Sequence, residues 1–378
     1  KNYPRIVFAS TMIGYEGNGR GYTLRFLHYL RSQFKSLKTI TLGEPIRFAN
    51  HDPLENIIRE LLLLDAKYLD KQSSEAYKFE NISKEQLIDD EQLLSQIMVL
   101  LALAHYQTTV NDLRQLLDAP ELQLSICKQE NALKAVCLIA IEGGLTAEIA
   151  EQVIKGKRRP HGHLMAQTLT QLSRNTEDLC KRSARVVRIA VAPESHQQGI
   201  GSALLNFCEN QLKDCSYFGA SFGANAALVK FWQSNDFNVV KLGFSHDKAT
   251  AEHAALVMKA LDEQSKDRAA QFIEEFKQDL SLQLLSHFSS LPWQLIMELF
   301  KGLPRSDCPE GLNERAERLL TSDINHFQVQ PLLWQMIWCT PISLNLLDEN
   351  TKFILIRLVL QQTSVNSLIE EAGFTGKK

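Results

Sequence analysis

The stretch RVVRIAVAPESHQQGIGSALL, residues 185–205, decides the fold because it joins an apolar strand, a glycine-bearing loop and the start of a helix. Val187, Ile189 and Val191 occupy every second position, and β-branched side chains at this period favour a strand. After the loop, apolar residues return at helical spacing over 202–212. The sequence therefore predicts a strand, a tight loop and a helix in direct succession.

The two glycines of the loop, Gly199 and Gly201, bring no side chain to a place where the backbone has to come close to a ligand. A helix that opens beside them aims its first unpaired N–H groups and the positive end of its dipole at the same place. This arrangement favours a bound anion, above all a phosphate group. Spacing alone does not say which phosphate compound it is.

The run HQQGIG, residues 196–201, resembles motif A of the GNAT acetyltransferases, whose Q/R-x-x-G-x-G/A loop holds the pyrophosphate of acetyl-CoA. His196 stands where that family prefers Gln or Arg. The resemblance implies a GNAT fold, an α/β architecture with a mixed, largely antiparallel sheet flanked by helices. It also implies that the backbone N–H of Val191 polarises the thioester carbonyl. The acetyl-CoA contacts implied in this way are Ile189, Ala190, Val191, His196, Gln197, Gln198, Gly199, Ile200, Gly201 and Ser202.

Composition places limits on the possible partners. The chain has 378 residues, 44% of them hydrophobic and 22% charged, with a formal net charge of −3, which argues against a uniformly basic nucleic-acid binder. Seven scattered cysteines without a C-x-x-C pair indicate neither a disulfide framework nor a zinc site, so we expect no metal and a reducing, cytoplasmic location. No apolar run reaches the ~18 residues of a membrane span, and no signal peptide is evident. The start without Met suggests a fragment.

The first 70 residues read as the end of an α/β unit. A glycine-rich connection over 14–21 lacks the G-x-x-x-x-G-K-[ST] order of a phosphate-binding Walker A loop, which occurs nowhere in the chain. Asp52, followed by proline, is typical of the cap of a helix, here expected to run through Leu64. A polar stretch over 71–80 then indicates a linker.

Three short runs, GYEGNGRGY, PIRFA and DPLE, resemble the end of the ATPase/helicase-like module of the bacterial tRNA(Met) cytidine acetyltransferases, which carry a GNAT domain downstream. In that family the arginine of the second run reaches ATP, and here it is Arg47. The rest of that ATP site belongs to an upstream region with the Walker motifs, which this sequence does not contain. A surface salt bridge is the alternative role for Arg47.

An amphipathic helix is predicted over 81–105, with Ser83 and Gln86 forming a capping box. Its end, the pair His105–Tyr106, resembles a His-Tyr pair of the same family. The N4 amine of cytosine is a weak nucleophile, so a histidine that accepts its proton would help the reaction, while a tyrosine would orient it or protonate the leaving thiolate. The alternative is that both side chains merely end a packed helix.

A β-hairpin over 122–141 and a short helix over 146–154 lead to the sharpest positive patch of the chain. Four cations in this patch, Lys155, Lys157, Arg158 and Arg159, suit contacts with RNA phosphates, and the family has a comparable R-R-P-x-G loop. A solvated charged loop is the alternative. The neighbouring His161 and His163 are too few for a metal site.

Farther along, 217–223 is expected to be a strand, 226–237 a helix and 253–259 the last strand of the sheet. Ala227 and Ser234 stand where the family usually has Glu and Arg as acetyl-CoA contacts. The remainder, 262–378, reads as helices. We therefore expect the end of an ATPase module over 1–70, a GNAT domain over 71–261 and a helical, tRNA-binding domain over 262–378.

Taken with these resemblances, the sequence leads to an acetyltransferase that forms N4-acetylcytidine at the wobble position of elongator tRNA(Met), coupled in the family to ATP hydrolysis. Two alternatives stay open. One is a GNAT enzyme for a protein or small-molecule amine, which would leave the basic patch and the His-Tyr pair without a role. The other is a degenerate acyl-CoA or RNA-binding module, suggested by Ala227, Ser234 and the missing Walker A loop.

Overall fold

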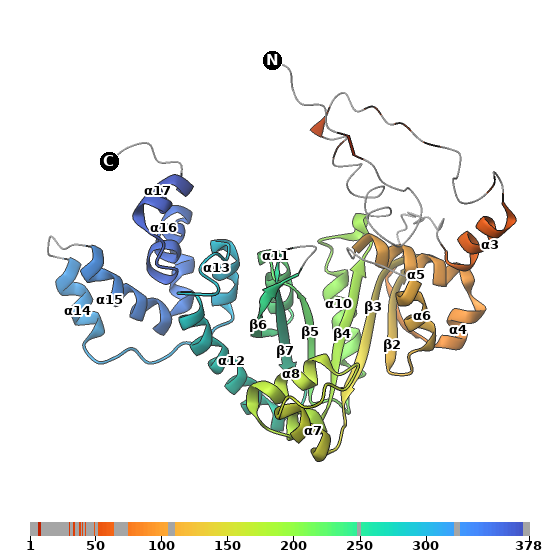
Figure 1. Cartoon of the computed structure of the whole chain (residues 1–378), viewed down its shortest axis with the longest axis horizontal. Coiled ribbons are helices and arrows are strands. Elements are labelled where there is room, and N and C mark those ends of the chain that lie inside the picture. Colours follow the sequence, from red (N-terminus) through yellow and green to blue (C-terminus); the bar gives the residue numbers. More distant parts are fainter. Residues whose placement is uncertain are drawn as a thin grey trace. The chain divides into compact units, whose positions relative to one another are not determined.

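The computed structural model describes residues 7–8, 30, 33–34, 38, 40, 42, 49, 52–63, 75–104, 110–247, 251–320 and 326–372. The chain divides into two compact units (Figure 1). Unit 1 comprises residues 1–141 and 186–213, and unit 2 comprises residues 142–185 and 214–378. Each unit is described here by itself.

The strands form one seven-stranded sheet in the order β1-β2-β3-β4-β5-β7-β6. They are β1 (Lys78–Ile82), β2 (Leu122–Gln129), β3 (Ala132–Gly143), β4 (Arg182–Val191), β5 (Tyr217–Gly223), β6 (Asn238–His246) and β7 (His253–Ala260). The predicted hairpin is confirmed as the antiparallel pair β2–β3, with Ser125 opposite Cys137. The strand expected over 253–259 is confirmed as β7, the last strand along the chain, but it does not lie at the edge, because it pairs antiparallel with both β5 and β6.

Unit 1 contains the helix α3 (Pro53–Leu61). Its predicted cap is confirmed, since the Asp52 carboxylate accepts a hydrogen bond from the backbone N–H of Leu54 at 2.8 Å. The helix ends three residues before the predicted Leu64. It lies inside the segment that was read as the tail of an α/β unit.

The single helix expected over 81–105 is instead a strand and two helices. Asn81 belongs to β1, α4 (Lys84–Asp89) begins at the predicted Ser83–Gln86 capping box, and α5 (Glu91–Ala104) follows. The break falls at Asp90, whose Oδ1 accepts a hydrogen bond from the N–H of Leu93 at 2.8 Å. Aspartate favours such a capping position over a helix interior, which explains why the apolar period alone missed the break.

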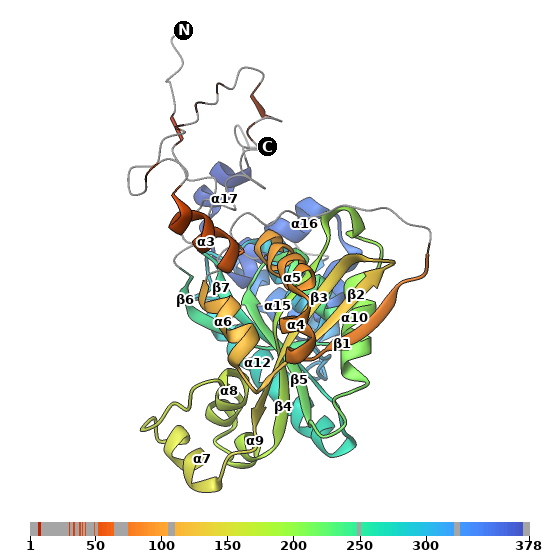
Figure 2. The ribbon, with the colours of Figure 1, turned by 90° about the vertical axis from the view of Figure 1, so that its right-hand side faces the viewer.

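Helices cover both faces of the sheet portion in unit 1 (Figures 1 and 2). On one face, α5 and α6 (Val110–Asp118) bury Ile97, Met98 and other apolar side chains against β2 and β3. On the other, α10 (Ile200–Glu209) brings Cys208 to Cys137 of β3. A hydrogen bond between these two thiols, together with burial, raises the pKa of Cys137 well above its usual value. The helix that follows the glycines is thus anchored on a rigid layer.

Unit 2 holds the remaining helices. They are α7 (Ala147–Ile154), α8 (Leu164–Ser173), α9 (Glu177–Cys180), α11 (Ala226–Gln233), α12 (Glu263–Gln283), α13 (Trp293–Lys301), α14 (Leu312–Leu320), α15 (His326–Cys339), α16 (Glu349–Ile354) and α17 (Val365–Ala372), with short helical turns at Pro193–Ser195 in unit 1 and at Pro341–Leu346 and Leu355–Leu360 in unit 2. The predicted helical character of 262–378 is confirmed in its described part. Among the described residues, none of the helices combines the length and apolar character that a membrane crossing needs.

A buried carboxylate organises the packing of unit 2 around β5. Asp178 accepts a hydrogen bond from the hydroxyl of Ser173 at 2.5 Å and pairs with Arg268 of α12 at 3.4 Å. The hydroxyl of Tyr217 on β5 lies 3.4 Å from the same carboxyl. Burial, more than the nearby charge, raises the pKa of Tyr217 to about 12. The network ties α8, α9 and α12 to the sheet.

Candidate functional site

The glycine loop, defined here as residues 196–202, follows β4 as the sequence predicted. Gly199 caps α10 with a φ of +77°, in the left-handed region that favours glycine. The helix begins at Ile200, two residues earlier than expected, and ends at Glu209 rather than near 212. The first hydrogen bond at this end runs from the N–H of Ala203 to the carbonyl of Gly199 at 2.9 Å.

The backbone amides of Ile200, Gly201 and Ser202 precede that first bond, so helix geometry gives them no partner inside α10. None of the hydrogen bonds in the described part of the chain uses them. A Cβ placed on Gly199 would meet no atom within 4 Å, so the space in front of the loop is open. The N-terminal end of α10 therefore fits a pyrophosphate, since it offers N–H donors, the positive end of the helix dipole and room for the ligand.

Side chains of the glycine loop hold its shape. Nε2 of His196 lies 2.9 Å from the carbonyl oxygen of Val191, which folds the loop back onto the end of β4. The Gln198 amide donates to the carbonyl of Glu194 at 3.0 Å and accepts from the hydroxyl of Tyr77 at 3.0 Å. These polar side chains face the protein's own backbone and each other. His196 and Gln198 are therefore engaged by the protein itself, and the backbone amides at the start of α10 stay available to a ligand.

Beneath the loop lies a buried ion pair that the sequence reading missed. Lys134 of β3 is only 2% exposed, and its Nζ lies 3.1 Å from Oε1 of Glu194. The carbonyl of Lys134 also accepts a hydrogen bond from the N–H of Ala192 at 2.8 Å. The one hint in the sequence is that the charged Lys134 directly precedes the apolar run AVCLIA, residues 135–140, where a buried strand is expected. Because the carboxylate of Glu194 accompanies the lysine, this cation is not a bare charge offered to a phosphate.

A second ion pair fastens α6 to β4. Nη2 of Arg188 lies 2.6 Å from Oδ1 of Asp112, and both side chains are largely buried. The segment between α5, which ends at Ala104, and α6, which begins at Val110, contains the predicted pair His105–Tyr106. Both residues lie outside the described part of the chain, as does Arg47. Their roles stay predictions.

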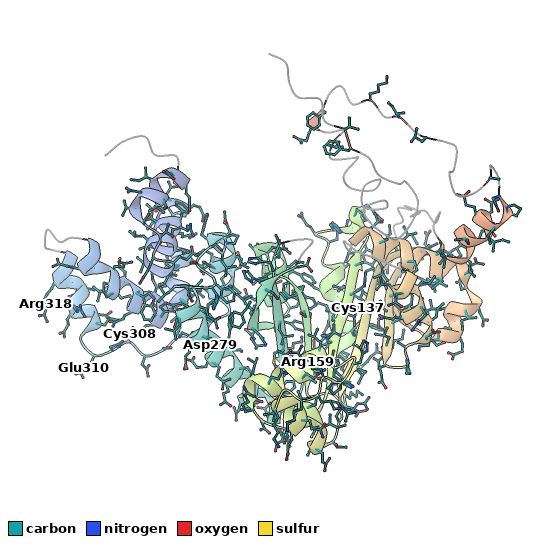
Figure 3. The ribbon with its side chains drawn as sticks, viewed as in Figure 1. Cys137, Arg159, Asp279, Cys308, Glu310 and Arg318 are labelled. Atoms are coloured by element: carbon teal, nitrogen blue, oxygen red, sulfur yellow. The ribbon has the colours of Figure 1, made fainter. Side chains whose placement is uncertain are left out.

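The basic loop, defined here as residues 155–163, follows α7 in unit 2. Lys155 pairs with Glu151 one helical turn earlier, with 3.1 Å between Nζ and Oε2. Lys157, Arg158 and Arg159 are exposed, and no ion pair within the described residues involves them. Arg159 is labelled in Figure 3. Three adjacent, uncompensated cations create the local field that a polyanion needs.

Hydrogen bonds fix the end of the basic loop where it meets α8. The Gln167 amide donates to the carbonyls of Pro160 and His163 at 2.6 and 2.9 Å. Nδ1 of His163 accepts the backbone N–H of Gly143 at 2.9 Å. Buried Glu142 accepts from the N–H of Met165 at 2.7 Å and pairs with Arg185. The loop is therefore held where α8 begins, while its cations point outward.

Because Nδ1 of His163 accepts that backbone N–H, the neutral ring carries its proton on Nε2. Neither nitrogen then offers a free lone pair to a metal. Within the described ranges, no three His, Cys, Asp or Glu side chains lie close enough to hold a metal ion. Ala227 lies on α11, and the hydroxyl of Ser234, at the end of that helix, donates to the carbonyl of Phe231 at 2.9 Å.

Comparisons with known proteins find two families along the chain, in the order that the sequence predicts. The family "RNA cytidine acetyltransferase NAT10/TcmA, helicase domain" matches residues 1–65, and the family "GNAT acetyltransferase 2" matches residues 96–212 and 203–262. The two matches confirm the resemblance of the N-terminal runs and of motif A to their families.

Curated relatives match nearly the whole chain. The tRNA(Met) cytidine acetyltransferase TmcA of Nitrosococcus halophilus is 33% identical over 378 residues, which cover 96% of this chain and 50% of the relative. That of Vibrio cholerae is 32% identical over 384 residues, covering 100% of this chain and 53% of the relative. The chain thus spans about half the length of these relatives.

Among solved structures, the ribosomal-protein-S18-alanine N-acetyltransferase from Escherichia coli aligns with 50% of this chain and 95% of its own, at 13% identity and a TM-score of 0.34. The family assignment rests on the sequence relatives, on the two family matches and on the strand, glycine loop and helix of motif A. Over nearly its whole length the chain is thus related to the tRNA(Met) cytidine acetyltransferases, and its central part is a GNAT acetyltransferase domain.

Proposed function

We propose that the protein transfers the acetyl group of acetyl-CoA to N4 of the wobble cytidine of elongator tRNA(Met), forming N4-acetylcytidine. The observation that carries the proposal is the start of α10, where three backbone amides beside an open Gly199 fit a pyrophosphate. The names of the relatives supply the acceptor, since those proteins are called tRNA(Met) cytidine acetyltransferases.

Acetyl-CoA supplies an acetyl group activated as a thioester. On the side of the protein, the amides of Ile200, Gly201 and Ser202 hold the pyrophosphate, and the remaining residues of the glycine loop keep those amides in place. The backbone N–H of Val191, at the end of β4, polarises the thioester carbonyl, a contact that needs no particular side chain. Ile189 and Ala190 provide the adjoining strand.

The acceptor chemistry falls to the segment between α5 and α6. His105 takes the proton that N4 loses as it attacks the carbonyl, and Tyr106 orients the ring or protonates the departing thiolate of CoA. The Arg188–Asp112 pair fixes α6 at one end of this segment, next to β4.

Recognition of the RNA begins with its phosphates. Lys157, Arg158 and Arg159 give the basic loop its uncompensated positive charge, and Lys155 adds to it beside Glu151. Contacts of this type position the RNA without reading its sequence. We further propose that 262–378 contributes to tRNA binding, next to the GNAT domain over 71–261.

Residues 1–70 complete the proposal as part of an ATPase/helicase-like module, in which Arg47 contributes to binding of ATP. The match of residues 1–65 to a helicase-domain family supports this role. ATP hydrolysis would then accompany acetyl transfer rather than supply the acetyl group.

The test supplies the chain with unmodified elongator tRNA(Met) and radiolabelled acetyl-CoA, with and without ATP, and analyses the nucleosides by mass spectrometry after digestion. We expect N4-acetylcytidine at the wobble position. A matched tRNA with uridine there, which lacks the N4 amine, should remain unlabelled. Label that appears instead on an added polyamine or peptide would replace this proposal with the amine-acetylating alternative.

A further inference from the structure

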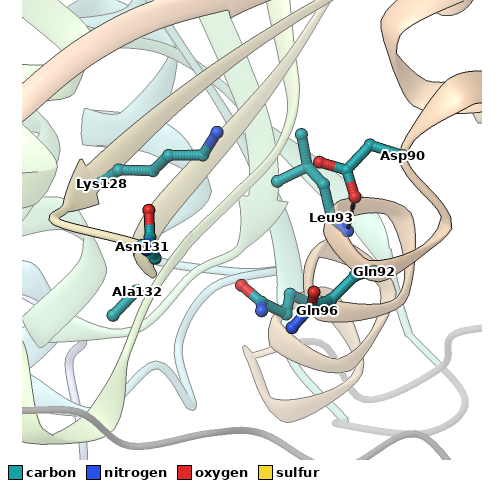
Figure 4. Close-up of a pocket in the computed structure, with 7 residues that line it drawn as sticks. All are labelled: Asp90, Gln92, Leu93, Gln96, Lys128, Asn131 and Ala132. Carbon is teal, nitrogen blue, oxygen red and sulfur yellow. Dashed lines mark hydrogen bonds between the residues drawn. The ribbon is translucent and has the colours of Figure 1, made fainter.

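A polar pocket in unit 1 has no part in the chemistry described above. It lies between the β2–β3 turn and the start of α5 and has a volume of about 260 Å³ (Figure 4). The β2–β3 hairpin supplies Lys128, Asn131 and Ala132 on one side, and on the other lie Asp90 and, from the first turns of α5, Gln92, Leu93 and Gln96. This is smaller than the ~300–1,000 Å³ of pockets for drug-sized ligands, so it suits a single small ring system.

The two charged side chains at the pocket are already engaged. Oδ1 of Asp90 caps α5 through the N–H of Leu93, and Nζ of Lys128 lies 2.8 Å from Oε1 of Glu80 on the neighbouring strand. One charge of each sign, both engaged, gives the pocket no preference for an anion or a cation. We therefore expect the part of a ligand that enters the pocket to be uncharged.

Three carboxamides remain for recognition. The side-chain amides of Gln92, Gln96 and Asn131 make no hydrogen bond with any of the described residues; Gln96 is half-buried, and the other two are exposed. Each carboxamide offers a donor and an acceptor side by side, the pattern that matches the hydrogen-bonding edge of a nucleobase. Leu93 and Ala132, both buried, form the apolar part of the pocket lining.

The pocket adjoins the acetyl-transfer end of the sheet. Ala132 precedes Lys134 by two residues on β3, and the carbonyl of Lys134 accepts the N–H of Ala192 just beyond β4. At ~3.3 Å per residue, the pocket begins roughly 7 Å along the strand from that bond. A nucleotide one or two positions from the acetylated cytidine can span this distance.

We propose that this pocket binds the base of a nucleotide that flanks the target cytidine, through Gln92, Gln96 and Asn131. The inference rests on the proposed function, because it takes the substrate to be RNA. It assigns to the pocket a role in selecting the RNA sequence, whereas the basic loop binds phosphates only.

The experiment measures binding of anticodon stem-loop RNAs in the presence of acetyl-CoA. One RNA is intact, and the others carry a single abasic nucleotide on either side of the target cytidine. For the unaltered chain, we expect one abasic RNA to bind about tenfold more weakly than the intact RNA, as the loss of one or two hydrogen-bonded contacts would produce. For the variant Gln96→Leu/Asn131→Ala, the intact and abasic RNAs should bind equally.

A matched control is Gln115→Leu, which changes an exposed glutamine on α6 outside the pocket and should preserve the tenfold difference. Acetyl-CoA affinity must be the same for all three proteins, which shows that the variants are folded. A tenfold difference that persists in the pocket variant overturns the pocket proposal alone. If the unaltered chain binds no stem-loop RNA at all, the proposed function fails and the pocket proposal falls with it.

Discussion

The glycine loop and the basic loop both suit anionic partners, but they do so by opposite means. In the glycine loop the donors are backbone amides at the start of α10, and the cation Lys134 is buried against Glu194. In the basic loop the donors are the exposed side chains of Lys157, Arg158 and Arg159. One loop offers an anion a fixed geometry of donors, and the other offers it charge.

This difference predicts different sensitivities. A site made of amides depends on the exact course of the backbone, so a single added side chain can block it, whereas moderate salt affects it little. A site made of flexible cations tolerates individual substitutions, but its affinity for phosphates falls steeply as the salt concentration rises. The predictions below separate the two kinds of binding, beginning with the largest effect.

Gly201→Glu should abolish acetyl-CoA binding. Gly201 is buried in the first turn of α10, among the amides that we assign to the pyrophosphate, and a glutamate there brings a negative charge into the space of a like-charged ligand. Isothermal titration calorimetry should detect no binding.

The matched substitution is Gly199→Ala, where a Cβ would meet no atom within 4 Å but the φ of +77° is strained for alanine. It should retain acetyl-CoA binding, while the backbone strain lowers the stability of the folded protein by about 1 kcal/mol. Unchanged affinity in a folded Gly201→Glu protein would rule out the pyrophosphate site.

His105→Ala should leave both loops intact and lower the rate of transfer. Loss of a general base costs ~10²–10⁴ in rate, so single-turnover acetyl transfer at saturating tRNA should fall by that factor while both affinities stay near those of the unaltered chain. Tyr106→Phe should cost less. A normal rate with a lowered melting temperature would show that the pair only ends a packed helix and that solvent takes the proton.

Neutralising Lys157, Arg158 and Arg159 together with glutamine should weaken tRNA binding by roughly 10- to 100-fold at ~0.15 M salt. The plot of log K against log salt should also lose roughly two to three units of slope, because each phosphate contact contributes about one. Acetyl-CoA affinity should not move. If both the affinity and its salt slope stay unchanged, the basic loop is a solvated surface.

Much of this architecture followed from local patterns. The strand, loop and helix over 185–212, the β2–β3 hairpin and the Ser83 capping box were all predictable, because each depends on residues close together in sequence. The break at Asp90 and the edge strand β6 were not. Strand order depends on which distant segments pair, and period-two patterning carries no information about the partner.

The candidate site divides along the same line. The glycines and the basic run announce themselves by composition, whereas Lys134, Tyr77 and Glu142 act through contacts with residues far away in the chain. Lys134 is 60 positions from Glu194, and Tyr77 is 121 positions from Gln198. No window of sequence reveals such pairs, and only the folded chain identifies them as supports of the loops.

The smallest predicted effect concerns one of these supports. The hydroxyl of Tyr77 donates to Gln198 at 3.0 Å, and Gln198 in turn donates to the carbonyl of Glu194, so Tyr77→Phe removes one member of a chain that fixes the glycine loop. An exposed neutral hydrogen bond contributes at the low end of ~0.5–1.5 kcal/mol, which corresponds to a roughly two- to fivefold loss of acetyl-CoA affinity. The aromatic ring stays, so the melting temperature should change little.

Calorimetry at two salt concentrations distinguishes this effect from a general one. If Tyr77 acts by holding the amides in place, the ratio of acetyl-CoA affinities between the unaltered chain and Tyr77→Phe should be the same at low and high salt. The salt dependence of tRNA binding should also be unchanged. A Tyr77→Phe protein with unaltered acetyl-CoA affinity would show that the loop keeps its shape without this bond. The contacts of His196 with the end of β4 and of Gln198 with Glu194 would then suffice to hold the glycine loop in shape.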